Sequence, residues 1–200
     1  MASKDRILRL KEETRCNILD ASLQIVKEEG WQALSMRKIA DMIEYTAPII
    51  YEYFANKDAI LMELTKKGYS ILNKALQQVV RSEEPDPAKQ LEGMWMAYWN
   101  FAHQERELYQ VMFGIEMNCC VMQQNFPELE MPYEIMSSVI EELMGDKATD
   151  EDAVCTWYYT CWSVVHGLIS LSMVRKDVSD EINRQVLSNA ITGIIRSIQA

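Results

Sequence analysis

The stretch SMRKIADMIEYTAPIIYEYFANK, residues 35–57, decides the fold of this chain. Its apolar residues recur at helical spacing, which predicts one short helix over residues 36–43 and a second over residues 47–53. Glu44 and Tyr45 fall between them and leave room only for a tight turn. Two short helices joined in this way form a helix-turn-helix.

The ends of both helices carry start signals. Ser35 and Thr46 stand where N-caps belong, because each hydroxyl can accept a hydrogen bond from an unpaired amide of the following turn. Pro48 falls in a first turn, where its missing N–H costs little. The side chains expected to form one small shared core are Ile39, Ala40, Ile43, Ile50 and Phe54.

Basic residues occupy unusual places in this stretch. Arg37 and Lys38 follow one cap and Lys57 follows the expected cap Asn56, although a cation at a helix N-terminus opposes the helix dipole by roughly 0.3–1 kcal/mol. A nucleic-acid phosphate at the same place would turn this repulsion into attraction. The alternative is that these residues are solvated cations without a special role.

Three runs of residues closely resemble the N-terminal domain of the tetracycline-repressor (TetR) family of bacterial transcriptional regulators. They are Arg15-x-x-Ile18-Leu19-x-Ala21, then Gly30 with Leu34-Ser35-x-Arg37-x-Ile39-Ala40, and Tyr51-x-Tyr53-Phe54-x-x-Lys57-x-x-x-Leu61. The family usually has Gly-Val in the turn, where this chain has Glu44-Tyr45. A left-handed residue other than glycine costs on the order of 1 kcal/mol, so we expect a slightly strained turn.

Composition bounds the remaining possibilities. The chain has 200 residues, of which 48% are hydrophobic, enough for a buried core. It contains no apolar run of about 18 residues and no signal-peptide pattern near its start, so we expect a cytoplasmic protein without a membrane partner. Five cysteines are expected as reduced core thiols, although the Cys119-Cys120 pair leaves a redox or soft-metal sensor open.

The net charge of −10 is unevenly divided. Residues 1–70 hold eleven basic and eleven acidic side chains, whereas residues 71–200 hold nine and nineteen. The acidic excess therefore belongs to the second part of the chain, and a neutral first part can still bind DNA if its cations cluster on one face. A basic arm of Lys4, Arg6, Arg9 and Lys11 precedes the first helix and either reaches DNA or is simply solvated.

Helical spacing continues along the whole chain, and no strand pattern appears. We predict an all-α protein of about nine helices, with a helix-turn-helix DNA-binding domain over residues 11–71 and an effector-binding and dimerisation domain over residues 72–200. Besides the two short helices, the expected helices span residues 14–29, 57–81, 87–103, 105–117, 132–144, 149–176 and 180–199.

The second part is rich in aromatic and methionine side chains, which can line an adaptable cavity for an apolar or aromatic effector or can simply form a core. Trp162-x-x-x-His166-Gly167 resembles a signature of one TetR subgroup. His166 is then either a buried core histidine or a polar anchor for the ligand. The candidate ligand-binding residues are Trp95, Trp99, Phe113, Met117, Met136, Trp157, Trp162 and His166.

The resemblance implies how DNA would be read. Ala47, Pro48 and Ile49 lead the second short helix and can contact thymine methyls, while Arg37 can fork onto guanine. The expected phosphate-binding residues are Ser35, Thr46, Tyr51, Tyr53 and Lys57. The family pairs its last two helices, so the expected homodimer interface contains Leu168, Met173, Leu187, Ile191, Ile194 and Ile198.

The motifs of common enzymes are absent from the sequence, including Gly-rich phosphate loops and G-x-S-x-G, and neither catalysis nor a cofactor or metal is expected. The resemblance implies a ligand-responsive regulator, expected to be a repressor, that binds a pseudo-palindromic double-stranded operator as a homodimer and leaves it when a small effector binds. The alternative is a helical small-molecule sensor or scaffold of the same fold without a role in gene regulation.

Overall fold

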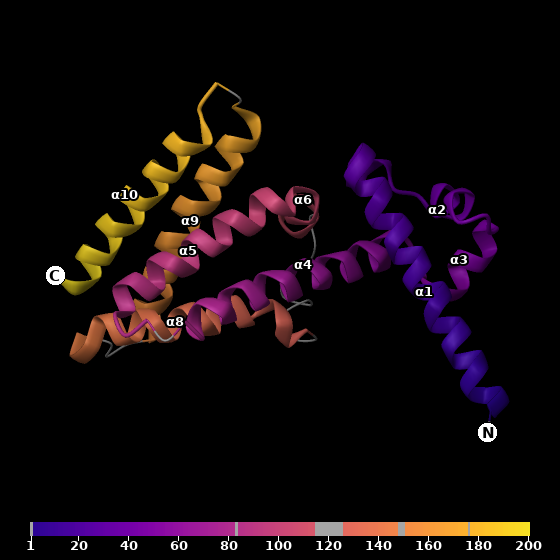
Figure 1. Cartoon of the computed structure of the whole chain (residues 1–200), viewed down its shortest axis with the longest axis horizontal. Coiled ribbons are helices and arrows are strands. Elements are labelled where there is room, and N and C mark those ends of the chain that lie inside the picture. Colours follow the sequence, from indigo (N-terminus) through magenta and orange to yellow (C-terminus); the bar gives the residue numbers. More distant parts are fainter. Residues whose placement is uncertain (1, 83, 115–125, 148–150, 176) are drawn as a thin grey trace. The chain divides into compact units, whose positions relative to one another are not determined.

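The computed structural model describes residues 2–82, 84–114, 126–147, 151–175 and 177–200. In these ranges the chain forms nine α-helices and three short 3-10 turns, with no strand (Figure 1). The prediction of an all-α fold is therefore confirmed. No helix in the described ranges is long and apolar enough to cross a membrane.

Helix bounds follow the caps closely. Ser179 accepts a hydrogen bond from the amide of Ile182 at 3.3 Å and starts the last helix, and the side chain of Asn56 accepts one from the amide of Ala59 at 2.9 Å. The helices are α1 (Ala2–Glu29), α2 (Met36–Met42), α3 (Ala47–Tyr53), α4 (Lys57–Val80), α5 (Pro87–Gln104), α6 (Arg106–Gly114), α8 (Met131–Met144), α9 (Glu151–Val174) and α10 (Asp180–Gln199). The 3-10 turns are η1 (Trp31–Ala33), η2 (Pro127–Leu129) and η3 (Gly145–Lys147).

The first compact unit comprises Met1–Gly68 together with Glu105–Glu116. Here α1 packs on η1 and α2, and α2 packs on α3. Helix α6 lies so close to α4 that a Cβ on Gly68 would overlap the sulfur of Met112. A glycine in a helix interior costs roughly 0.5–1 kcal/mol, and this close packing explains why one is placed there.

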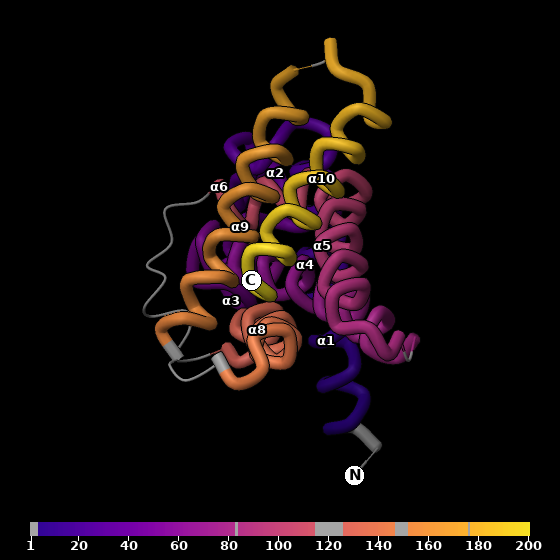
Figure 2. Tube along the Cα trace, turned by 90° about the vertical axis from the view of Figure 1, so that its left-hand side faces the viewer, coloured from indigo at the N-terminus to yellow at the C-terminus, as the bar shows by residue number. Residues whose placement is uncertain are grey.

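The second compact unit comprises Tyr69–Gln104 and Met117–Ala200. Its helix α5 packs on α8, α9 and α10, and α9 and α10 run side by side (Figures 1 and 2). The core of this unit includes several large side chains with no exposed surface, among them Trp95, Trp99 and Met136. The second unit, which lies in the acidic part of the chain, thus has a substantial core of its own.

Two features differ from the sequence-based expectation. Helix α1 begins at Ala2 rather than near Thr14, so the basic arm is part of a continuous helix whose residues from Lys4 to Glu13 are exposed. Helix α6 belongs to the first unit although it lies far along the chain, within the predicted second domain. Sequence patterns locate helices but do not report which neighbours a helix packs against.

Candidate nucleic-acid interface and effector region

The helix-turn-helix is held by one shared core and one cap. Ile39, Ala40 and Ile50 are buried between α2 and α3, as expected. The Ser35 hydroxyl accepts a hydrogen bond from the amide of Lys38 at 3.2 Å. The packing and the cap together fix the start of α2, where Arg37 lies.

The turn between the two helices contains a left-handed residue. Glu44 has a φ of 58°, the one positive value among the described residues other than glycine. The amide of Tyr45 donates to the carbonyl of Ala40 at 2.9 Å and closes the turn. The expected strain at Glu44 is therefore present, and the helix-turn-helix geometry forms despite it.

The start of α3 presents an apolar leading face. Pro48 is exposed and Ala47 and Ile49 are half-buried, so methyl and methylene groups dominate this end of the helix. The Thr46 side chain makes no cap hydrogen bond, although its hydroxyl was expected to accept one from a backbone amide. Its exposed hydroxyl, like that of the exposed Tyr51, remains accessible to an external acceptor.

The basic residues near this face differ in their partners. Lys38 forms an ion pair with Glu29 of α1, which engages its ammonium within the chain. Lys57 donates to the backbone carbonyl of Gln32 at 3.1 Å. Arg37 is exposed and makes no ion pair with any residue that the structure describes. Arg37 is thus the basic side chain of this group that is best placed to bind an external group.

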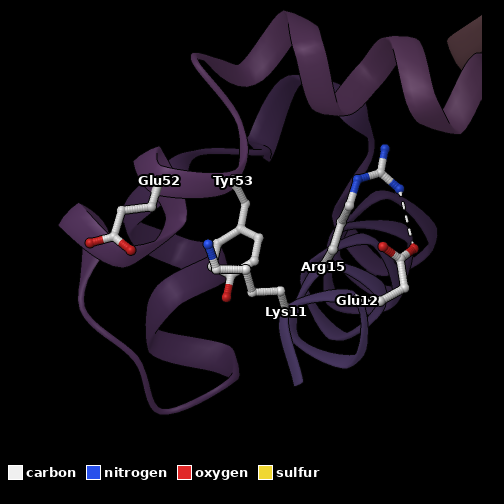
Figure 3. Close-up of a pocket in the computed structure, with 5 residues that line it drawn as sticks. All are labelled: Lys11, Glu12, Arg15, Glu52 and Tyr53. Atoms are coloured by element: carbon white, nitrogen blue, oxygen red, sulfur yellow. Dashed lines mark ion pairs between the residues drawn. The ribbon is translucent and has the colours of Figure 1, made fainter. Parts of the chain in front are cut away.

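A polar pocket of about 240 Å³ lies between α1 and α3 (Figure 3). It is lined by Lys11, Glu12, Arg15, Glu52 and Tyr53, two cations and two anions around one phenol ring. Figure 3 shows the Glu12–Arg15 ion pair, at 4.0 Å, on one side of the pocket. This balance of charge gives the pocket no net preference for an anion.

The predicted effector residues are only partly brought together. Trp95 and Trp99 of α5 and Met136 of α8 are fully buried in the second unit, whereas Trp157 and Trp162 of α9 are half-buried. Phe113 belongs to the first unit, so the structure does not place it with the others. Met117 and the Cys119-Cys120 pair lie outside the described residues.

Trp162 and His166 share one face of α9, as their spacing predicts. Their rings stack with centroids 5.1 Å apart, and the Trp162 indole N–H donates to the Tyr98 hydroxyl at 3.0 Å. Burial lowers the pKa of His166 below its ordinary value, which favours the neutral imidazole. A half-buried neutral histidine next to a hydrogen-bonded tryptophan suits either of its two expected roles.

Several polar atoms of the second unit are buried without a hydrogen-bond partner. They include the indole nitrogen of Trp99 on α5 and the hydroxyl of Ser137 on α8, both judged against the residues that the structure describes. A buried donor without an acceptor costs about 1–3 kcal/mol. These atoms are the polar groups of this core whose hydrogen-bonding capacity is unused within the described part of the chain.

The last two helices carry apolar side chains on two faces. Leu187, Ile191 and Ile198 point into the core of their own chain and are almost fully buried. Leu168, Met173 and Ile194 are half-buried. Besides the aromatic Tyr159, the exposed aliphatic residues of the two helices are Val164, Leu171, Val174, Ile182 and Val186. These aliphatic residues lie three, four or seven positions apart along their helices. This helical spacing is the feature of the sequence from which the second, outward apolar face could have been predicted.

The fold and this interface define a helix-turn-helix protein with a separate helical unit. Residues 18–64 match the profile of the bacterial regulatory proteins of the tetR family, and residues 91–181 match a tetracyclin repressor-like C-terminal domain. The two matches together cover more than half of the chain. The chain belongs to the TetR family.

Similar proteins include both a transcriptional activator and a transcriptional repressor. The chain is 22% identical over 103 residues to the transcriptional activator FasR of Mycolicibacterium smegmatis, covering 52% of this chain and 47% of FasR. It is 24% identical over 90 residues to the transcriptional repressor NicS of Pseudomonas putida, covering 45% of this chain and 42% of NicS. The chain spans less than half the length of these curated relatives.

Solved structures share the whole fold. The regulator FadR of Bacillus subtilis, in complex with stearoyl-CoA, superposes with a TM-score of 0.68 at 17% identity, over 90% of this chain and 96% of FadR. At this level of identity the similarity concerns the fold. Both units of the chain therefore have counterparts in a known TetR-type architecture.

Proposed function

We propose that this protein is a ligand-responsive DNA-binding transcriptional regulator, acting in the cytoplasm as a homodimer on a pseudo-palindromic operator. The observation that carries the proposal is the exposed Arg37 beside the apolar leading face of α3, on a capped and packed helix-turn-helix. An arginine fork can read guanine, and apolar groups can contact thymine methyls. The relatives include an activator and a repressor, and we propose that this protein is a repressor. We propose no enzymatic role for it.

Homodimerisation is proposed through α9 and α10. Their exposed face includes Leu171, which is 60% exposed, and Ile182, which is 56% exposed. Gly167 and Gly193 add to this face, because a Cβ at either position would meet nothing within 4 Å in the single chain. Exposed apolar side chains beside open glycines suit close packing against a second copy.

The proposed effector is a small molecule with an apolar or aromatic body. The buried tryptophans of α5 offer ring faces for that body, and the Trp99 N–H, which has no acceptor among the described residues, offers a donor for a polar group on it. FadR of Bacillus subtilis, which has this fold, is in complex with stearoyl-CoA. An effector of this kind would regulate DNA binding only if it binds two states of the protein with different affinity.

A gel-shift assay tests the proposed function. The probe is duplex DNA that flanks the protein's own coding region, and unlabelled nonspecific duplex is the competitor. Retention of a complex in excess competitor supports a specific regulator. Loss of every complex at the competitor level that removes nonspecific binding supports the alternative, a helical sensor without a regulatory role.

A further inference from the structure

We propose that Trp31 is a positioning residue for DNA binding, which holds the Lys57 ammonium ready for a backbone phosphate. This inference rests on the proposed DNA-binding function and adds a residue to it. Trp31 starts the 3-10 turn η1, directly after Gly30, whose φ of 85° redirects the chain at the end of α1. Lys57 starts α4, 26 residues further along the sequence.

The contact between the two side chains is specific. The Lys57 ammonium lies over the Trp31 ring, 5.6 Å from its centroid, which is within the range of a cation–π interaction. The same nitrogen donates to the carbonyl of Gln32, the next residue of the turn, at 3.1 Å. A lysine ammonium has three donors, so two remain available for a phosphate.

Trp31 also lies against the end of α6. The position of a Cβ on Gly114, the last residue of that helix, would lie 3.4 Å from the indole nitrogen of Trp31. An ion pair between Lys27 of α1 and Glu105, at 3.9 Å, fixes the other end of the same helix on the first unit. The indole therefore contacts both a lysine side chain and the end of a helix, and these two contacts restrict its rotation.

This arrangement lowers the cost of binding DNA. A free lysine side chain loses rotamer entropy when a ligand immobilises it, which opposes binding. Lys57 has lost part of that freedom already, because the ring and the carbonyl hold its ammonium at the start of α4. A phosphate at a helix N-terminus also accepts hydrogen bonds from the free amides there. Trp31 thus acts on DNA affinity only through Lys57.

The experiment is a double-mutant cycle on a duplex that the wild-type protein has selected from a random pool. The variants are Trp31→Leu, Lys57→Met and the combination of both, with Trp31→Phe as the matched control that keeps an aromatic face. Fluorescence anisotropy gives Kd over a series of salt concentrations, and thermal unfolding verifies that each variant is folded. If Trp31→Leu unfolds, Trp31→Met replaces it, because its longer and more flexible side chain of similar volume adapts better to the site.

We expect Trp31→Leu to weaken binding about two- to fivefold without changing the salt dependence, and Trp31→Phe to bind within about twofold of wild type. Lys57→Met should flatten the salt dependence by about one unit per DNA-binding unit, and adding Trp31→Leu to it should cost nothing further. An equal loss from Trp31→Leu in both backgrounds, or none in wild type, overturns the proposal. Failure of the wild-type protein to select any duplex would instead contradict the proposed function.

Discussion

Arg15 of α1 and Glu63 of α4 form an ion pair that joins the two helices of the DNA-binding unit. Glu63 also accepts from Lys66 at 2.8 Å, and the Arg15 guanidinium lies 5.3 Å from the centroid of the Phe54 ring. Three-quarters of the Glu63 side chain is shielded from solvent. Helix α4 is thereby fixed to the scaffold that also carries the helix-turn-helix.

The stability of this unit should depend on the charge of Glu63. Burial raises the pKa of Glu63, but the hydrogen bonds and charges of Lys66 and Arg15 outweigh it and leave the pKa below the ordinary 4.5. The stabilising contribution is therefore complete above the ordinary pKa and is lost as the pH falls through the folded value. We expect Glu63→Gln to lower the free energy of unfolding by about 1–2 kcal/mol at pH 7, as measured by urea denaturation.

The difference between Glu63→Gln and wild type should narrow when the urea titrations are repeated at pH values below the ordinary pKa of a glutamate. The exposed Glu13→Gln is the matched control, since Glu13 is 58% exposed and, among the residues that the structure describes, forms an ion pair with its helical neighbour Arg9 alone. A constant difference at all pH values would show that the carboxylate charge is not the stabilising feature.

The turn residue Glu44 gives a second prediction. Its φ of 58° is unfavourable for any side chain, so Glu44→Gly should raise the free energy of unfolding by about 1 kcal/mol. Tyr45→Gly is the control, because Tyr45 has no positive φ, so its replacement relieves no strain, adds flexibility to the unfolded chain and removes the contacts of the partly buried ring. Thermal unfolding in which both variants lose stability equally would mean that Glu44 is not strained.

Arg37 should determine base preference. Replacing it with alanine removes the proposed guanine contact, and we expect binding to weaken by about 1–3 kcal/mol with relaxed preference at one guanine per half-site. Lys38→Ala is the matched control, because Lys38 is paired with Glu29 instead. Sequencing of duplexes selected by each variant gives the comparison. Identical preferences for Arg37→Ala and wild type would remove Arg37 from the proposed base-reading set.

The dimer should depend on the outward face of α9 and α10. A glutamate at Leu171 or Ile182 places a charge in the proposed apolar contact and should convert the dimer to a monomer at micromolar concentration. Val80→Glu, at a 43% exposed apolar position at the end of α4, is the control and should leave the dimer intact. Light scattering measures both. A wild-type monomer, or a dimer that survives both substitutions, contradicts this interface.

The effector region should respond to apolar ligands through its tryptophans. Titration with stearoyl-CoA and a panel of aromatic compounds should change the tryptophan fluorescence for at least one of them. Trp99→Phe removes a buried N–H that has no acceptor among the described residues, and we expect it to weaken binding of that compound by about 1–2 kcal/mol. Trp31→Phe, a substitution in the first unit, should leave the affinity for that compound unchanged. No response from any compound would indicate a solid core.

Local chemistry explains what the sequence could predict. Ser35, Asn56 and Ser179 cap their helices as expected, because a cap depends on residues only two or three positions away. The left-handed turn at Glu44 was equally local. The expected cap bond of Thr46 does not form, which shows that a suitable side chain alone does not dictate its rotamer.

Long-range packing explains what the sequence did not predict. The contact of Lys57 with Trp31 depends on how α4 returns to η1, and no periodicity reports it. On α10, helical spacing places Leu187, Ile191 and Ile198 on one apolar face and Ile182 and Val186 on another. When one helix has two apolar faces, the sequence does not tell which of them packs into the core of its own chain. The structure shows which face is buried and which is exposed.

Selection of duplexes from a random DNA pool is the direct test of whether this protein is a sequence-specific, dimeric DNA-binding regulator. We predict that the wild-type protein enriches a motif of two inverted half-sites, because a symmetric dimer presents two helix-turn-helix units to the duplex. We also predict that the enriched duplex withstands excess nonspecific DNA. Sequencing that shows no enriched motif, from protein that light scattering shows to be a folded dimer, would contradict a sequence-specific regulator.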